Sequence, residues 1–128
     1  MRFNGFHHIG LIVNDVEKSF KFYTEGLGGK LTFQFPMDDS GKPVYLVDLG
    51  GNAVVELIPK GNEGEESNAR WAHIAVNTDD AEAAYAAALA AGAKPQGGSH
   101  ESLLGTRKVL NPFVMGPDGE LIEFFQPL

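Results

Sequence analysis

Alternating apolar and polar positions mark two similar stretches of the chain. In residues 6–13 the alternation places His8, Gly10 and Ile12 on one face and a mostly branched apolar set, with Ile9, Leu11 and Val13, on the other. Residues 71–77 repeat this arrangement around His73. Both stretches are therefore predicted to be strands with a histidine on the less bulky face. Because His7 falls on the apolar face, His8 is the residue that corresponds to His73.

A helical pattern follows each of these predicted strands. Asp15 is a suitable N-cap for a helix that Gly28 and Gly29 end. In the second half, high-propensity alanines predict a helix over about residues 80–91, which Gly92 ends. Apolar runs between turn signals predict the remaining strands. These strands are expected at residues 31–35, 44–49, 53–58, 94–98, 109–115 and 121–125, with loops at 36–43 and 99–108.

Each half then has the order β-α-β-β-β, so the sequence predicts a duplicated module of the α+β class. Module 1 covers residues 6–58 and module 2 covers residues 71–125. Residues 59–70 are rich in Gly, Asn and Glu and are expected to be a linker. Residues 1–128 are expected to form one domain, which is long enough to bury an apolar core.

Each half also carries a glutamate in the middle of an apolar strand. Glu56 lies 48 residues after His8, and Glu123 lies 50 residues after His73. Alternation places each carboxylate on an otherwise apolar face, where an unpaired charge is costly, and neither strand contains Lys or Arg. The four residues would satisfy one another by holding a divalent metal. Imidazole and carboxylate together suit zinc, nickel, cobalt, iron(II) or manganese.

Each of these residues also has an ordinary structural interpretation. A single His on a strand is more often a core residue than a ligand, and a single Glu in an apolar strand is often an edge residue that faces water. The recurrence of both residues at matched places in the two halves favours a metal site or polar active site over these interpretations.

Composition and charge restrict the classes of partner. The net charge of -7 argues against binding along nucleic acid, which needs a basic face, but allows a small anionic substrate. No apolar run approaches the roughly 20 residues of a membrane span. The chain has no cysteine, which excludes disulfides and thiolate ligands, and its start has no signal-peptide pattern. A cytoplasmic protein is therefore expected.

Four motifs together resemble those of a known superfamily and cover essentially the whole chain. They are His8-Ile9-Gly10-Leu11 with Asp15 and Phe22-Tyr23 downstream, Val55-Glu56-Leu57, His73-Ile74-Ala75-Val76, and Pro117-Asp118-Gly119-Glu120-Leu121-Ile122-Glu123. In combination they are similar to the motifs of the vicinal oxygen chelate superfamily, which contains glyoxalases, bleomycin-resistance proteins and dioxygenases. The resemblance implies paired βαβββ modules whose sheets curl around a central metal. The modules pair within one chain or across a homodimer, and a homodimer is expected.

Within the superfamily, the order His, Glu, His, Glu is similar to the ligand set of glyoxalase I, the lactoylglutathione lyase. It falls here on His8, Glu56, His73 and Glu123. The resemblance implies a metal-dependent lyase or isomerase that moves a proton between adjacent carbons of a 2-oxo, hemithioacetal-type substrate through an enediolate. Glu123 is the first choice for the base that transfers the proton, with Glu56 close behind.

The sequence departs from the glutathione-dependent enzymes at two places. Those enzymes carry an arginine four residues after the first His, where this chain has Ile12. They also have a basic, glycine-rich loop before the penultimate strand, for which residues 103–108 are a partial substitute. Arg107 and Lys108 are therefore candidate contacts for an anionic substrate. These departures argue against glutathione as the carrier, and another thiol, a CoA ester or a free 2-oxo or 2-hydroxy compound suits the sequence.

Two other functions remain open. The first is an epimerase acting on an acyl-CoA such as methylmalonyl-CoA, although epimerases of the superfamily usually carry Gln at the place of Glu56. The second is a binding protein that sequesters a drug or metabolite, as bleomycin-resistance proteins do. Those proteins generally lack the metal ligands, so the complete set of four argues against this function.

Overall fold

The structure is a computed structural model that describes residues 1–60, 70–96, 100–117, 119 and 121–128. The described chain divides into two compact units. The N-unit consists of His8–Ala72, and the C-unit consists of His73–Leu128 together with Met1–His7. The C-unit thus includes the first seven residues, which the sequence pattern did not assign to module 2. Most of the expected linker, residues 61–69, lies outside the described residues.

The N-unit contains a four-stranded mixed sheet in the order β2-β3-β4-β1. Its strands are β1 (Phe3–Ile12, which enters the N-unit at His8), β2 (Lys30–Pro36), β3 (Pro43–Asp48) and β4 (Val54–Ile58). β4 runs parallel to β1 and antiparallel to β3. The parallel pairing places Gly10 directly opposite Glu56. This register determines which side chain of β1 reaches the glutamate.

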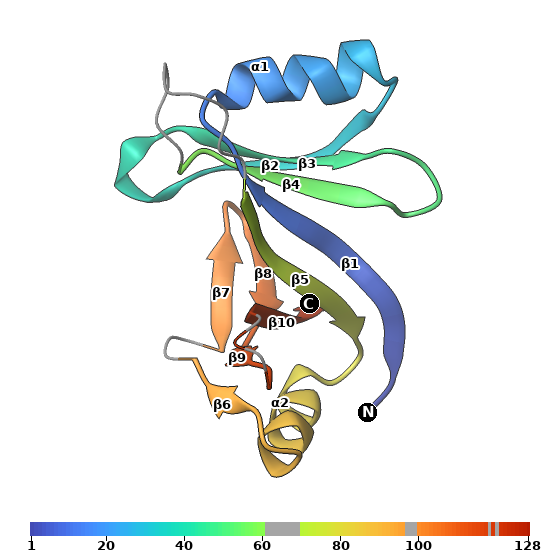
Figure 1. Cartoon of the computed structure of the whole chain (residues 1–128), viewed down its shortest axis with the longest axis vertical. Coiled ribbons are helices and arrows are strands. Elements are labelled where there is room, and N and C mark those ends of the chain that lie inside the picture. The colour runs from blue at the N-terminus through green and yellow to red at the C-terminus, as the bar shows by residue number, and fades with distance from the viewer. Residues whose placement is uncertain (61–69, 97–99, 118, 120) are drawn as a thin grey trace. The chain divides into compact units, whose positions relative to one another are not determined.

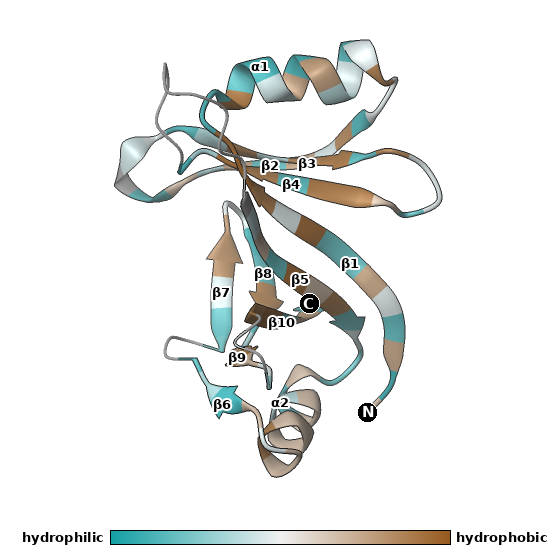
Figure 2. Ribbon diagram, viewed as in Figure 1, coloured by the Kyte–Doolittle hydropathy of each residue, from teal (hydrophilic) through white to brown (hydrophobic). Residues whose placement is uncertain are grey.

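A helix covers one face of the N-unit sheet. α1 (Val16–Lys21) begins at Asp15, whose carboxylate accepts a hydrogen bond from the Lys18 amide at 3.1 Å. The helix continues as a π-helical turn over Phe22–Gly26, and Leu27 beyond it is exposed. Figure 1 shows α1 lying along the strands, and Figure 2 shows hydrophobic residues along β3 and β4. The buried residues between helix and sheet are Leu11, Val13, Val16, Tyr45, Val47 and Leu57.

A hydrogen bond also joins α1 to the N-unit sheet. The Tyr45 hydroxyl on β3 donates to Glu17 Oε1 on α1 at 2.7 Å. Burial of the phenol, followed by its hydrogen bond and its charge interaction with Glu17, raises the pKa of Tyr45 to about 12.

The C-unit contains strands in the order β5-β10-β8-β7, with a short β9 between β10 and β6. Its strands are β5 (Arg70–Thr78), β6 (Lys94–Pro95), β7 (Glu101–Leu104), β8 (Arg107–Leu110), β9 (Phe113–Met115) and β10 (Leu121–Pro127). β10 runs parallel to β5, as β4 does to β1. The first residues of the chain join this unit, because the Arg2 carbonyl accepts a hydrogen bond from Thr78 Oγ1 at 3.0 Å.

The C-unit helix also begins as predicted. α2 (Ala81–Ala90) is capped by Asp80, whose carboxylate accepts a hydrogen bond from the Ala83 amide at 2.9 Å. Its small side chains pack against Val114 and Phe124 on one face of the sheet. A separate cluster, Ala75, Val109 and Phe125 with Leu104, lies on the other face. Neither described helix is long and apolar enough to span a membrane.

Two predictions about the second half were wrong. The segment predicted as a loop at residues 99–108 contains β7 and the start of β8, which form a hairpin around Gly105 and Thr106. The single strand predicted at residues 109–115 is split into β8 and β9. The split occurs at Asn111-Pro112 because proline has no amide hydrogen to donate to a neighbouring strand.

Candidate metal centre

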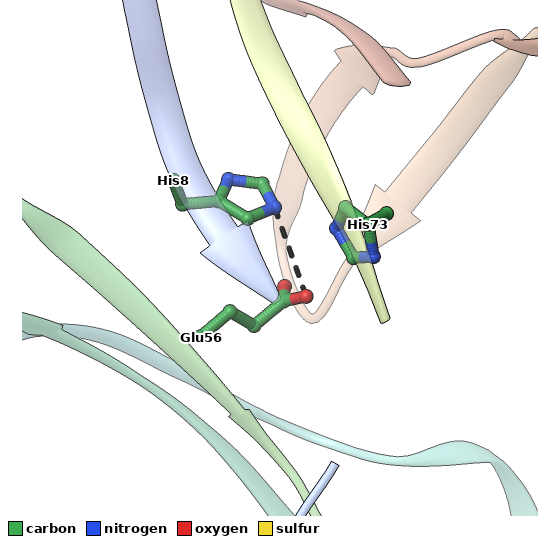
Figure 3. A group of neighbouring side chains, drawn as sticks. All are labelled: His8, Glu56 and His73. Carbon is green, nitrogen blue, oxygen red and sulfur yellow. Dashed lines mark ion pairs between the residues drawn. The ribbon is translucent and has the colours of Figure 1, made fainter. Parts of the chain in front are cut away.

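The N-unit builds the first His–Glu pair through its strand register. His8 and Gly10 lie on the same face of β1, and Gly10 is the direct partner of Glu56. Because Gly10 has no side chain, the space beside the carboxylate is open to the imidazole of His8. His8 Nε2 lies 3.7 Å from Glu56 Oε1, and both side chains are buried (Figure 3).

The C-unit builds a second pair by the same register. Ala75 is the direct partner of Glu123, and His73 lies two residues before Ala75, as His8 lies two residues before Gly10. His73 Nε2 is 3.1 Å from Glu123 Oε2, and both side chains are almost fully buried. Each pair therefore combines a His, a small residue two positions later and a Glu on the parallel neighbouring strand. The repetition that the sequence suggests is present in the register of the two sheets.

Each pair fits a divalent cation. An imidazole nitrogen that faces a carboxylate oxygen in a buried place needs either a proton or a metal ion beside it. Adjacent ligand atoms about 2.1 Å from one ion are roughly 3.0–3.4 Å apart in octahedral or tetrahedral geometry. The separations of 3.7 Å at His8–Glu56 and 3.1 Å at His73–Glu123 are close to this range. Nitrogen and carboxylate donors also match the zinc, nickel, cobalt, iron or manganese preference expected from the sequence.

Asn111 is a further residue of this region that sequence reasoning missed. Its Nδ2 donates a hydrogen bond to Glu123 Oε1 at 3.2 Å, and its side chain is buried. The strand break at Asn111-Pro112 allows this contact, since Asn111 lies between the end of β8 at Leu110 and the start of β9 at Phe113. The signal in the sequence was an Asn-Pro dipeptide within an otherwise apolar run, which is typical of a turn or strand end.

The two predicted anion contacts lie on opposite faces of the β7–β8 hairpin. Arg107 shares a face with Val109, which packs with Phe125 on the side of the C-unit sheet that carries Glu123. Lys108 alternates to the other face and pairs with Glu101, with Nζ 3.0 Å from Oε1. Both basic side chains are exposed. Of the two, only Arg107 is on the face of the candidate centre.

Comparison with known proteins places the chain in a family. Residues 5–124 match the Glyoxalase/Bleomycin resistance protein/Dioxygenase superfamily. A Vibrio parahaemolyticus protein named probable lactoylglutathione lyase is 32% identical over 93% of this chain and 88% of its own length. The uncharacterized protein YwbC of Bacillus subtilis is 31% identical over 93% of this chain and 94% of its own length.

Solved structures of similar fold agree with this match. Methylmalonyl-CoA epimerase from Mycobacterium tuberculosis superposes with a TM-score of 0.78 at 22% identity, covering 98% of this chain and 89% of that protein. The Mn(II)-bound glyoxalase from Novosphingobium aromaticivorans gives a TM-score of 0.70 at 21% identity, covering 98% of this chain and 39% of that protein. These likenesses confirm the predicted glyoxalase-like α+β fold. By its sequence match over nearly the whole chain, the protein belongs to the glyoxalase/bleomycin resistance protein/dioxygenase superfamily.

Proposed function

We propose that this protein is a divalent-metal-dependent lyase or isomerase of the glyoxalase I type. The ligands of its metal are His8, Glu56, His73 and Glu123. The observation that carries the proposal is the pair of register-matched His–Glu contacts, one in each unit. The relative named as a probable lactoylglutathione lyase, at 32% identity, supports the same reaction class.

The proposal assigns all four residues to one metal centre. One His and one Glu leave most of the coordination positions of an ion to water, whereas zinc enzymes supply three or more protein ligands. Two pairs together supply four. The two pairs come from one chain or from two chains of a homodimer, which is the oligomeric state that we propose.

The proposed reaction is an isomerisation that needs no oxidant or reductant. A bound divalent cation supplies Lewis acidity, which makes the C–H bond beside a carbonyl or hydroxyl oxygen more acidic. Glu123 takes the proton from one carbon and returns it to the neighbouring carbon, and an enediolate forms in between. One C–H bond breaks and another forms, the hydroxyl proton of the substrate moves to the former carbonyl oxygen, and the carboxylate ends in its starting state. Glu56 is the alternative base because its pair has the same register.

The substrate class is part of the proposal. The similarity to a relative named probable lactoylglutathione lyase supports a small 2-oxo compound joined to a thiol as a hemithioacetal. Arg107, on the face of the candidate centre, is the proposed contact for an anionic group of the thiol carrier. With Ile12 where glutathione-dependent enzymes carry arginine, a carrier other than glutathione is favoured.

The first experiment measures metal content by elemental analysis in wild type and in His8→Ala and His73→Ala variants. His7→Ala, next to His8 in sequence, and His100→Ala, in the same unit as His73, are the matched controls, since each removes an imidazole without removing a proposed ligand. We expect one ion per proposed site in wild type and in both controls, and loss of that ion in either ligand variant. Two ions per chain, with each variant losing one, would indicate two separate two-residue sites.

The second experiment identifies the reaction of the metal-loaded protein. Hemithioacetals of methylglyoxal with several thiols are assayed for thioester formation, and racemic methylmalonyl-CoA is assayed for exchange of its α-proton in D2O. Thioester formation supports the glyoxalase reaction, and exchange with methylmalonyl-CoA alone identifies an epimerase. A protein that takes up no metal after incubation with nickel, cobalt, zinc and manganese contradicts the proposal and leaves a ligand-binding role.

A further inference from the structure

The two glutamates of the candidate centre have different neighbours despite their common register. Glu56 on β4 lies directly opposite Leu46 on β3, and Glu123 on β10 lies directly opposite Phe113 on β9. Two positions before each of these partners, on the same face, the N-unit has Val44. The C-unit has Asn111 at the corresponding place. The position that holds Asn111, whose amide bonds Glu123, therefore corresponds to a valine in the N-unit.

The Asn111 amide and the His73 ring contact different oxygens of Glu123. Asn111 Nδ2 donates to Oε1 at 3.2 Å, and His73 Nε2 lies 3.1 Å from Oε2. A carboxylate with a donor on one oxygen loses freedom of rotation about its last bond, so its other oxygen keeps a defined direction. The direction that results here is toward His73.

The backbone around Asn111 is fixed on both sides. The Asn111 amide donates to the His100 carbonyl at 2.7 Å, and the Pro112 carbonyl accepts from the Phe124 amide at 3.0 Å. Phe124 is the residue that follows Glu123. The side chain that holds the carboxylate is therefore attached to the strand that carries the carboxylate, which limits their relative movement.

Stability alone gives a weak reason for an asparagine at this place. Asn111 Oδ1 is buried and has no hydrogen-bond partner in the part of the chain that the structure describes. The cost of a buried acceptor without a partner is of the same order as the gain from a hydrogen bond to a carboxylate. An aliphatic residue such as the valine of the N-unit would avoid that cost. The amide group is better explained by what it does to Glu123.

We infer that Asn111 is a positioning residue, which holds Oε1 of Glu123 so that Oε2 faces His73. The inference rests on the proposed function, in which Glu123 is a metal ligand. Within that centre, Asn111 holds one carboxylate oxygen of Glu123 and the other faces His73. Asn111 itself contacts neither substrate nor metal in this role. It acts through the orientation of Glu123.

The test compares Asn111→Leu and Asn111→Asp with a matched control. Leucine keeps the branching at Cγ and removes the donor, and aspartate keeps the size and shape and removes the N–H donor. The control is Thr78→Val, which removes a buried hydroxyl of the C-unit that bonds the Arg2 carbonyl and alternates to the face of β5 opposite His73. Thermal unfolding midpoints check that all variants fold.

The first readout uses metal-free protein. Ring nitrogen signals of 15N-labelled His73 are recorded at one fixed pH. We expect both Asn111 variants to shift these signals, because both lose the donor, and Thr78→Val to leave them unchanged. A purely steric role would predict a shift in the leucine variant only. Unchanged His73 signals in both Asn111 variants overturn the inference, whether or not the protein binds a metal.

The second readout is Mn2+ affinity by titration calorimetry. We expect Asn111→Leu to bind Mn2+ about 10- to 100-fold more weakly than wild type, the usual effect of losing a residue that orients a ligand. An affinity equal to that of wild type overturns the inference and leaves the proposed function in place. A wild type that binds no Mn2+ or other divalent ion contradicts the proposed function instead, and the His73 signals then decide the positioning role by themselves.

Discussion

Raising the pH above 10 should weaken the attachment of α1 to the N-unit sheet, because the Tyr45 hydroxyl donates to Glu17 only while it is protonated. Tyr45 is 9% exposed, and its pKa is raised from 10.0 to about 12. The folded protein therefore keeps the phenol proton at pH values where the unfolded chain has already lost it. The contribution of the Tyr45 phenol to the free energy of unfolding is complete below about pH 10 and is lost as the pH rises toward 12.

The magnitude follows from the size of the shift. A difference of two pKa units between the unfolded and the folded protein corresponds to about 2.7 kcal/mol of unfolding free energy, once both states have lost the proton. By the linkage relation, about 0.4 kcal/mol is lost at pH 10, about 1.4 at pH 11 and about 2.3 at pH 12. Because the hydroxyl bonds the exposed Glu17, solvent screening reduces this effect, and these values are upper limits.

The assay is urea unfolding at several pH values from 9 to 12, with Tyr45→Phe as the control. Far-UV circular dichroism and the fluorescence of Trp71 are followed together, because a chain of two units need not unfold in one step. Subtracting the variant from wild type removes the contribution of every other titrating group. Wild type should be the more stable protein at pH 9, by about 1 kcal/mol for the hydrogen bond. This difference should fall by about 2 kcal/mol and change sign by pH 12. A difference that stays constant across this range would refute the role given to Tyr45.

Two further predictions concern packing and substrate binding. A Cβ at Gly29 would lie 2.5 Å from the Tyr23 carbonyl oxygen, so Gly29→Ala should lower the free energy of unfolding by about 1–3 kcal/mol. At Gly26 the nearest atom is 3.8 Å away, and Gly26→Ala should be neutral or slightly stabilising in the same denaturation assay. In steady-state kinetics of the metal-loaded protein, Arg107→Ala should raise KM several-fold for an anionic substrate. Lys108→Ala should leave KM unchanged. Equal effects of the two variants would contradict the proposal that only Arg107 lies on the face of the candidate centre.

Alternation was a sound guide to the strands around both pairs. It predicted that Val55 and Leu57 face the core and Glu56 the opposite side, and Leu57 is fully buried in the cluster against α1. It also separated His8 from His7, whose ring lies against Phe125 with centroids 3.9 Å apart. A period of two residues survives in long strands because every second side chain must be buried.

The second half was harder to predict because its strands are short. β7 and β8 have four residues each, too few for alternation to be distinguished from a loop rich in Ser, Gly and charged residues. Gly105, with a φ of 63°, was the only strong turn signal in that segment. The pairing of β8 with the end of β10 depends on tertiary contacts between residues far apart in sequence, which a local pattern does not contain.

The same short strands explain why the two halves of the candidate centre differ. In the N-unit, β3 passes Glu56 as one continuous strand, and Val44 and Leu46, both buried, lie on the face of Glu56. In the C-unit, the equivalent strand is interrupted at Pro112, and a residue at the end of a strand need not match the apolar pattern of its middle. The interruption therefore allows a polar side chain, Asn111, within reach of Glu123. A duplication alone would yield two equivalent glutamates. The broken strand gives one of them an additional donor, and this is the physical reason to expect Glu123 and Glu56 to respond differently to the same Glu→Gln substitution.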